Sequence, residues 1–448
     1  MSETGSLSSS AHSFVCVIIY WGFLFSNFAN ARGLDSLLQH LPQLGAFNNI
    51  FESRIVLNVE DYGAKGDGIK DDTKVFGHVW DVACSSKAKE ARIIIPDGSR
   101  CLVRPISLAG PCISKVTLMI SGSIVAPRNP DVWHGNDTHK WLYFHGVNHL
   151  TVEGGGTIDG MGKEWWASSC KIDPKNPCRH APTAITFHRC NNLVVKNLMI
   201  VNGQQMQIAF TTCDGVAVSR LGVFAPAGSP NTDGIHISAS TNVEVKDSTI
   251  RTGDDCISIV SNSSKVKIRT IVCGPGHGIS IGSLGKTGSC DQVYDVSVRG
   301  AFLSNTENGL RIKTWQGGSG FVSNVKFEDV LMENVSNPII IDQYYCDSSK
   351  SCANKTCAVN VENISYVNIK GTSASKEAIT FACSDVSPCE GLYLEDVQLV
   401  SATGGITTSF CWEAKGSTSG IVYPPPCYSF CASFINQITS SIPHLQAI

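Results

Sequence analysis

Charged residues are scarce in this chain, and neither sign predominates. Asp, Glu, Lys and Arg together make up 16% of the 448 residues, and the formal net charge is -3. A net charge this small creates no overall field that would attract a polyanion, so the composition gives no support for nucleic-acid binding. An acidic substrate would have to be held by individual Arg or Lys side chains placed within its site.

Long hydrophobic runs are also missing beyond the N-terminus. No segment after residue 31 approaches the roughly twenty apolar residues that a membrane-spanning helix needs. The N-terminal run from Phe14 to Phe25 has twelve residues and is followed by Ala29-Asn30-Ala31, a small-residue pattern typical of signal cleavage. We therefore expect a signal peptide over residues 1–31 and a secreted protein, extracellular or in the cell wall, without membrane contact after cleavage. A buried helix is the alternative, because no Lys or Arg precedes the run.

The cysteine count agrees with export. The chain has 19 cysteines, and loss of Cys16 with the leader leaves 18, an even number that suits disulfides formed in an oxidising compartment. A zinc site is the alternative, but it needs closely spaced cysteine pairs with matching His, whereas these cysteines are scattered, so we expect no metal. Sequons for N-glycosylation also fit secretion. They lie at Asn136, Asn262, Asn334, Asn354 and Asn363.

Glycine is abundant, with 41 residues, which suits many short strands joined by turns. One strand of each repeat is marked by a recurring phrase, a small residue followed by an Ile-x-Ile pattern. Its copies are Gly234-Ile235-His236-Ile237, Cys256-Ile257-Ser258-Ile259, Gly278-Ile279-Ser280-Ile281, Gly309-Leu310-Arg311-Ile312 and Pro338-Ile339-Ile340-Ile341. Their first apolar positions are separated by 22, 22, 31 and 29 residues, so the later repeats carry insertions in a turn.

A companion strand accompanies these copies. Examples are Val194-Val195-Lys196, Val216-Ala217-Val218, Val243-Glu244-Val245, Val266-Lys267-Ile268, Val296-Ser297-Val298 and Val325-Lys326-Phe327. One repeat cannot bury its apolar face, but stacked repeats can, with each strand pairing to its equivalent one turn on at about 4.8 Å. The sequence therefore predicts an all-β, single-domain parallel β-helix, a solenoid, over residues 57–427. A β-sandwich is the alternative, although its hairpins would not preserve the phrase.

The open ends of such a solenoid need covers. Between Asp71 and Ser85 the apolar residues follow helical spacing, and Asp71-Asp72 offers an N-cap, which predicts a short N-terminal capping helix. We also expect an N-terminal extension over residues 32–56. The tail over residues 428–448 is either a second cap or a loosely docked extension.

The equal 22-residue steps bring three polar residues into line. Asp255 follows Asp233 by 22 residues, and His277 follows Asp255 by 22. If the repeats stack in register, these side chains share one edge of the solenoid, with Asp254 beside them. Carboxylates held this close repel one another, so at least one should have a raised pKa and keep its proton, as a general acid requires. One proton donor and one carboxylate that activates water are what glycoside hydrolysis needs.

Each of these motifs, taken alone, has a simpler interpretation that involves no catalysis. Asn231-Thr232-Asp233-Gly234 is typical of a turn, and Gly253-Asp254-Asp255 is typical of a solvated loop or a weak calcium site. His277 between two glycines could be an ordinary surface residue. The coincidence of all three on one edge favours a catalytic site.

Two cations follow on the next strand. Arg311 and Lys313 lie two residues apart and so face the same side, in the columns of Ser280 and Gly282 one coil earlier. As an isolated pair they would form a solvated strand face. Beside a carboxylate cluster, they either steady the acids or bind a substrate that carries its own carboxylate, and we expect a uronic acid.

Four short motifs now stand in order along the chain. They are Asn231-Thr232-Asp233, Gly253-Asp254-Asp255, Gly276-His277-Gly278 and Arg311-Ile312-Lys313. Together they resemble the signature motifs of the polygalacturonases, the pectin-hydrolysing glycoside hydrolase family 28, and the phrasing is most similar to plant members. Three further segments look like family segments, so the resemblance covers about residues 57–427. These are Tyr62 to Gly68 with Asp71-Asp72-Thr73, Gly154 to Gly160, and Asp342 to Cys346.

The resemblance implies a right-handed parallel β-helix that hydrolyses α-1,4 bonds between the galacturonates of pectin, with inversion and without a metal or other cofactor. By the same resemblance, Asp254 is the general acid and Asp233 with Asp255 activates the water. His277 would support the acid's protonation or the sugar. The residues expected to bind the substrate and its carboxylate are Arg311, Lys313, Tyr345 and Asn231.

The family pattern also suggests two disulfides, Cys84 to Cys101 and Cys256 to Cys273. The second would tie the catalytic coil to the next. We expect a monomer, and internal (endo) cleavage is favoured over cleavage from chain ends.

One segment departs from the family pattern. Many relatives have Asn-Ser and, after three further residues, His. This chain reads Asn202-Gly203-Gln204-Gln205-Met206-Gln207, with Gly and Gln in the Ser and His places. Competing functions are a pectate lyase that uses calcium, a hydrolase of rhamnogalacturonan or xylogalacturonan, and a catalytically idle binder of wall polysaccharide.

Overall fold

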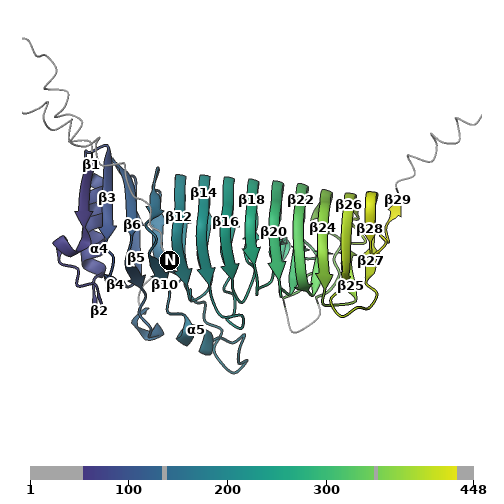
Figure 1. The fold of residues 1–448 in the computed structure, drawn as a ribbon, viewed down its shortest axis with the longest axis horizontal. Helices are drawn as coiled ribbons and strands as arrows, with labels where there is room; N and C mark the ends of the chain where they lie inside the picture. The colour runs from purple at the N-terminus through teal and green to yellow at the C-terminus, as the bar shows by residue number, and fades with distance from the viewer. Residues whose placement is uncertain (1–53, 134–138, 348–351, 431–448) are drawn as a thin grey trace, which may run out of the picture. The chain divides into compact units, whose positions relative to one another are not determined.

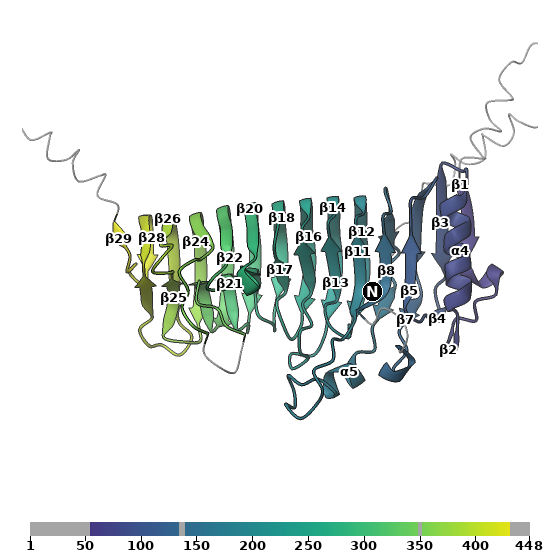
Figure 2. The ribbon, with the colours of Figure 1, turned by 180° about the vertical axis from the view of Figure 1, so that it is seen from behind.

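A computed structural model describes residues 54–133, 139–347 and 352–430, and there the chain winds into a right-handed parallel β-helix (Figure 1, Figure 2). This confirms the predicted fold class. The expected leader over residues 1–31, the sequon at Asn136 and most of the expected extension and tail lie outside the described residues. Among the helices of the described ranges, none combines the length and the apolar character needed to cross a membrane.

The strands form two sheets. The first contains β1 (Arg54–Asn58), β2 (Asp67–Asp71), β3 (Glu90–Ile95), β4 (Arg100–Leu102), β6 (Lys115–Ile120), β7 (Ser123–Val125), β9 (Thr151–Glu153), β10 (Thr157–Asp159), β12 (Asn191–Val201), β14 (Asp214–Phe224), β16 (Thr241–Arg251), β18 (Ser263–Cys273), β20 (Cys290–Ser304), β22 (Ser319–Val335), β24 (Asn360–Ser373), β26 (Cys389–Ser401), β28 (Ala414–Tyr423) and β29 (Ser429–Phe430). The second contains β5 (Ile106–Ala109), β8 (Lys140–His145), β11 (Thr183–His188), β13 (Ile208–Thr211), β15 (Ile235–Ser238), β17 (Ile257–Ile259), β19 (Ile279–Leu284), β21 (Asn308–Thr314), β23 (Asn337–Asp342), β25 (Glu377–Ala382) and β27 (Thr408–Trp412).

Helices are short and few among the described residues. The α-helices are α4 (Thr73–Ser85) and α5 (Lys163–Ala167), and the 3-10 helices are η2 (Val59–Tyr62), η3 (Pro130–Trp133) and η4 (Lys286–Gly288). α5 and its loop project from one edge of the solenoid (Figure 1).

The predicted register of the second sheet is confirmed. β15, β17, β19, β21 and β23 pair in parallel, one coil to the next. The first apolar residues of the recurring phrase are register partners, namely Ile235, Ile257, Ile279, Leu310 and Ile339. Arg311 pairs with Ser280 and Lys313 with Gly282, as the column argument predicted.

Alternate residues of this sheet fill the interior. Phe144, Phe187 and Phe210 are register partners whose rings stack with centroids 4.9 and 5.5 Å apart. The same column continues through Ile237, Ile259, Ile281, Ile312 and Ile341. The second apolar position of the phrase therefore recurs because it supplies the continuous core that one coil alone could not form.

A column of left-handed residues turns the long strands of the first sheet around a corner. Residues at equivalent positions of successive strands have φ between 51° and 56°, except for Gly300 in β20, whose φ is 69°. They are Asn197, Arg220, Asp247, Thr270, Asp329, Asn368 and Asp396. Asn and Asp predominate because they tolerate this conformation better than other residues with a Cβ.

The predicted capping helix is α4, which covers the N-terminal end of the solenoid (Figure 2). Its buried face consists of Phe76, Val79, Trp80 and Ala83. The N-cap differs in detail from the prediction. Asp72 holds the N-cap position but makes no side-chain cap, because its carboxylate accepts the backbone N–H groups of Lys65 and Gly66 at 2.7 and 3.1 Å.

Six disulfides are found among the described residues. They are Cys84–Cys112, Cys170–Cys178, Cys256–Cys273, Cys346–Cys352, Cys383–Cys389 and Cys411–Cys427. The pair Cys256–Cys273 was predicted and is confirmed. The predicted pair Cys84–Cys101 is wrong, because β4 turns Cys101 into the core, where it is fully buried beside Ser99, while Cys84 at the end of α4 faces the loop that carries Cys112.

The predicted sequons that can be assessed lie on the surface. Asn262, Asn334, Asn354 and Asn363 are all exposed. Asn334 Nδ2, the atom that would be modified, donates a hydrogen bond to Asn305 Oδ1 at 2.8 Å. Glycosylation at the four positions stays a prediction.

Candidate active site

Two glycines of the sequence motifs let neighbouring coils approach closely at the edge of the second sheet. A Cβ on Gly253 would lie 2.1 Å from the carbonyl oxygen of Ser229. Gly278 has φ of +81°, and a Cβ there would lie 2.0 Å from the carbonyl oxygen of Asn308. Only glycine fits at either place. The glycines next to the acidic and His residues are therefore explained by the backbone spacing of the site.

Asp233, Asp254 and Asp255 occupy turns that precede β15 and β17, and His277 precedes β19. The backbone holds these turns together through hydrogen bonds from Gly234 N to Asp255 O at 2.9 Å and from His277 N to Asp254 O at 2.8 Å. Asp233 and Asp255 are buried, with 8% and 1% of their surface exposed. Of the three aspartates, Asp254 lines an open cleft of about 340 Å³.

Asp255 is enclosed by positive charge. Arg311 Nη2 lies 2.7 Å from Asp255 Oδ1, and Lys313 Nζ lies 2.9 Å from Oδ2. Ser280 Oγ donates a further hydrogen bond to Oδ1 at 2.8 Å. Arg311 and Lys313 are themselves 9% and 7% exposed, so this is a buried ionic cluster behind the cleft. Both cations also line the cleft, where their remaining N–H groups can meet a ligand.

Asp233 is the carboxyl group with the most unfavourable surroundings for a charge. Burial, followed by the negative charges of Asp254 and Asp255, raises its pKa well above the ordinary value. Ser258 Oγ donates to Asp233 Oδ2 at 2.8 Å, which only partly offsets this. The raised pKa expected for one member of the cluster therefore falls on Asp233 in the free protein.

His236 lies beside Asp233 but carries no positive charge that would stabilise the Asp233 carboxylate. Its Nδ1 is 2.8 Å from Ser258 Oγ and 4.0 Å from Asp233 Oδ2. Burial lowers the pKa of His236 to about 4, so this ring is neutral at ordinary pH. His236 therefore contributes a hydrogen bond with Ser258, which in turn contacts Asp233, and it supplies no positive charge.

Asp254 and His277 form a pair that can carry one proton. His277 Nδ1 lies 3.1 Å from Asp254 Oδ1. Burial opposes charge on both groups, but the His277 hydrogen bond and positive charge outweigh it and lower the pKa of Asp254. Burial likewise opposes protonation of His277, but Asp254 and then Glu307 outweigh it and raise the His277 pKa. Glu307 Oε2 is 3.3 Å from the other ring nitrogen.

The predicted substrate residues Asn231 and Tyr345 lie in the same cleft. Asn231 Nδ2 is 3.4 Å from Asp254 Oδ2. The ring centroid of Tyr345 is 5.4 Å from Lys313 Nζ, and burial raises the pKa of its hydroxyl to about 12. The neutral phenol can therefore donate a hydrogen bond to an anionic ligand.

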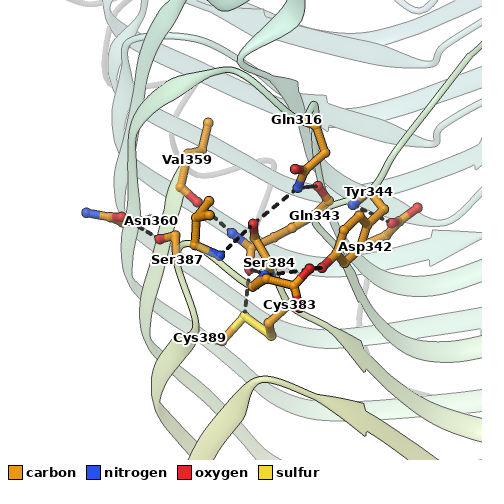
Figure 3. The surroundings of a disulfide bond; sticks show 12 residues. Gln316, Asp342, Gln343, Tyr344, Val359, Asn360, Cys383, Ser384, Ser387 and Cys389 are labelled. Carbon is orange, nitrogen blue, oxygen red and sulfur yellow. Dashed lines mark hydrogen bonds between the residues drawn. A yellow bond between two sulfur atoms is a disulfide. The ribbon is translucent and has the colours of Figure 1, made fainter. Parts of the chain in front are cut away.

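A buried glutamine anchors the segment that carries Tyr345. Gln343 Nε2 donates to the Val359 carbonyl at 2.7 Å, and its Oε1 accepts the backbone N–H of Ser384 at 2.9 Å. These contacts lie around the Cys383–Cys389 disulfide (Figure 3). Gln343 is fully buried and its amide is paired on both sides, so it fixes the turn from which Tyr345 reaches the cleft.

The departures at Gly203 and Gln207 form a matched pair behind the cleft wall. Gln207 is fully buried, and its Oε1 accepts the backbone N–H of Gly203 at 2.8 Å. A Cβ on Gly203 would lie 2.9 Å from the Gln207 amide, so the small residue makes room for the longer one. The carbonyl of Gly203 accepts the indole N–H of Trp166 at 3.2 Å, which ties α5 to this segment.

One group of side chains has the composition of a metal site. Single ligand-type atoms of Asp254, Asp255 and His277 lie within 4.8 Å of one another. However, both oxygens of Asp255 already face the cations Arg311 and Lys313, which would repel a divalent ion. The charges around this group thus favour protons and anionic ligands over a metal.

Several residues of the site were not singled out from the sequence. Ser258 and Ser280 occupy the outward position of the Ile-x-Ile phrase, and a polar residue recurring there in adjacent repeats was an available signal. Glu307 had no such signal, because it lies in the turn stacked on that of His277, in a repeat whose step is 31 residues instead of 22. Lys171 and Asp347 come from loops far apart in sequence, and only folding places them in the cleft.

The chain is similar to several known proteins in sequence and in structure. The sequence profile of the glycosyl hydrolases family 28 matches residues 84–420. A probable polygalacturonase of Arabidopsis thaliana is 58% identical over 414 residues, which are 92% of this chain and 93% of that protein. A polygalacturonase of Malus domestica is 50% identical over 370 residues, which are 82% of this chain and 78% of that protein. A solved structure of an endo-xylogalacturonan hydrolase from Aspergillus tubingensis shares the fold, with a TM-score of 0.68 at 23% identity over 82% of this chain and 100% of that chain.

Proposed function

The chain belongs to the glycosyl hydrolases family 28, and we propose that it hydrolyses the galacturonic-acid backbone of pectin by adding water across α-1,4 bonds with inversion. The observation that carries the proposal is the position of Asp254, which faces the cleft beside His277 and a buried cluster of two cations. The names of the relatives from Arabidopsis thaliana and Malus domestica agree with it. We place the enzyme outside the cell, as a monomer acting on wall pectin.

The Asp254–His277 pair is the proton donor in this proposal. The two groups share a proton, and Asp254 delivers it to the leaving glycosidic oxygen because it is the aspartate that lines the cleft. His277 with its raised pKa keeps the pair protonated toward neutral pH. The inverting reaction also needs a second carboxylate, which activates a water molecule on the opposite face of the sugar.

Asp233, together with Asp255, activates the attacking water. Asp233 has to lose its proton for this role, so its raised pKa sets the lower limit of the working pH. Arg311 and Lys313 hold the two oxygens of Asp255 by ion pairs. The free N–H groups of these cations and the Tyr345 hydroxyl would bind the carboxylate of the sugar.

The direct test is incubation of the purified protein with polygalacturonate. We expect new reducing ends, no ultraviolet absorbance from an unsaturated product, and full activity with a chelator present. A calcium-dependent, absorbing product would identify a lyase and overturn the proposal. Sizing the products over time tests the favoured endo mode, since internal cleavage yields a ladder of oligomers and terminal cleavage yields monomer alone.

A further inference from the structure

A second cavity adjoins the catalytic cleft. It is lined by Trp166 of α5, by Lys171 and Arg179 of the loop after α5, and by Gln204. The two spaces share Lys171, Pro230 and Asn231 in their walls. A polymer that places one sugar beside Asp254 would therefore reach the second cavity with a neighbouring sugar.

Lys171 stands at the junction of these two spaces and is held by an acidic residue from the other side of the cleft. Its Nζ lies 2.7 Å from Asp347 Oδ1, and the two side chains are 49% and 44% exposed. The residues are 176 positions apart, and each follows a disulfide cysteine, Cys170 or Cys346. Exposed ion pairs of this kind are weak, so an anionic ligand can replace Asp347 as the partner of Lys171.

The rest of the cavity also offers unsatisfied polar groups. The exposed guanidinium of Arg179 has no ion pair or hydrogen bond with any side chain in the described part of the chain. Gln204 is 1% exposed, and within the same part of the chain neither atom of its amide has a partner. A buried amide without hydrogen-bond partners lowers stability, because its desolvation is not compensated. A polar ligand in the cavity could supply the missing hydrogen bonds. The Trp166 ring adds an aromatic surface of the kind that sugars pack against.

We propose that this cavity binds the next uronate of the substrate chain, and that Lys171 exchanges Asp347 for that uronate's carboxylate, with Arg179 as the second cation. The inference rests on the proposed function, because it takes the substrate to be a polyuronate. Asp347 is then an internal competitor that occupies Lys171 until substrate arrives. If the Lys171–Asp347 ion pair served only to tie the two disulfide loops together, it would show no such exchange.

The test compares Lys171→Gln with Asp347→Asn on polygalacturonate. Removing the cation should raise KM about tenfold with kcat changed less than about twofold, because a ground-state contact is lost. Removing the competitor should leave KM unchanged or lower it by about two- to threefold, since Lys171 is then free. Arg179→Gln should act in the same direction as Lys171→Gln. A matched control is the pair Lys415–Glu390, which is similarly exposed at 48% and 63% and 3.0 Å apart, and whose Lys415→Gln and Glu390→Gln variants should leave KM unchanged.

The proposal is overturned if Lys171→Gln and Asp347→Asn both raise KM to the same extent, as expected for an ion pair with a purely structural role. It is also overturned if neither substitution changes KM. Calorimetric titration of oligogalacturonate into Asp254→Asn proteins with and without Lys171→Gln separates this inference from the proposed function. We expect roughly tenfold weaker binding without Lys171. Equal binding would reject the second uronate site even where the enzyme is active, whereas absence of cleavage by the unmodified enzyme would reject the proposed function by itself.

Discussion

His277 Nδ1 lies 3.1 Å from Asp254 Oδ1, and this contact joins the cleft-facing aspartate to a ring whose pKa is raised by the neighbouring carboxylates. Glu307 supports His277 from the other ring nitrogen at 3.3 Å. Behind them, Asp255 is neutralised by Arg311 and Lys313, and Asp233 has a raised pKa. Three aspartates of the same chemical type therefore have three different environments, from which separate roles follow.

Replacing Asp254 by Asn should lower kcat on polygalacturonate by roughly 10²–10⁴-fold, because the leaving oxygen loses its proton donor. Binding of polygalacturonate, measured by calorimetry, should change little, since the amide has nearly the same shape. An unchanged thermal unfolding midpoint would serve as the folding control. Retained turnover would contradict the assignment of Asp254 as the acid.

The pH dependence of kcat/KM should be bell-shaped. Activity should fall as the pH drops through the raised pKa of Asp233, because the water-activating carboxylate becomes protonated. Activity should also fall as the pH rises through the raised pKa of His277, because the donor pair loses its proton. In His277→Asn the alkaline limb should move to lower pH, since Asp254 alone holds a proton less strongly than the pair. An alkaline limb at the same pH in both proteins would show that His277 does not govern it.

Arg311→Gln should destabilise the fold by about 3–5 kcal/mol, because Asp255 would keep a buried charge with half its compensation. Urea unfolding at neutral pH measures the change. Adding Asp255→Asn to Arg311→Gln should recover part of the loss, as expected for two groups in contact. Lys326→Gln, which removes an exposed cation 2.8 Å from Glu328, should change stability by no more than about 0.5 kcal/mol. Equal effects of the two single substitutions would contradict the buried cluster.

Gly203→Ser should destabilise the protein by about 1–3 kcal/mol, because its Cβ would press on the Gln207 amide at 2.9 Å. Gly228→Ser is the control, since a Cβ at that glycine meets nothing within 4 Å. Combining Gly203→Ser with Gln207→Ala should cost less than the sum of the single changes. Strict additivity in urea unfolding would show that the two positions are not matched.

Much of this protein could be predicted from local sequence because the solenoid repeats itself. The period of two along each strand and the 22-residue steps predicted the strands, their parallel register and the columns of Ile257 and Arg311, all of which the structure confirms. Because equivalent residues of successive coils stack on one another, the position of Asp255 relative to Asp233 and His277 followed from counting residues. The capping helix followed in the same way from its spacing.

Tertiary structure decided the contacts that depend on which way a side chain turns and on loops between repeats. Counting could not show that Asp255 turns to Arg311 and Lys313 while His277 turns to Asp254, because residues in one column can face the core or the cleft. Counting also could not choose the partner of Cys84, since the burial of Cys101 depends on β4 packing into the core. Burial and neighbouring charge, which set the pKa of an aspartate, are properties of the folded surroundings. Sequence therefore determined that Asp233, Asp254, Asp255 and His277 stand together, and only the fold decided which further groups join them and how they share protons and charge.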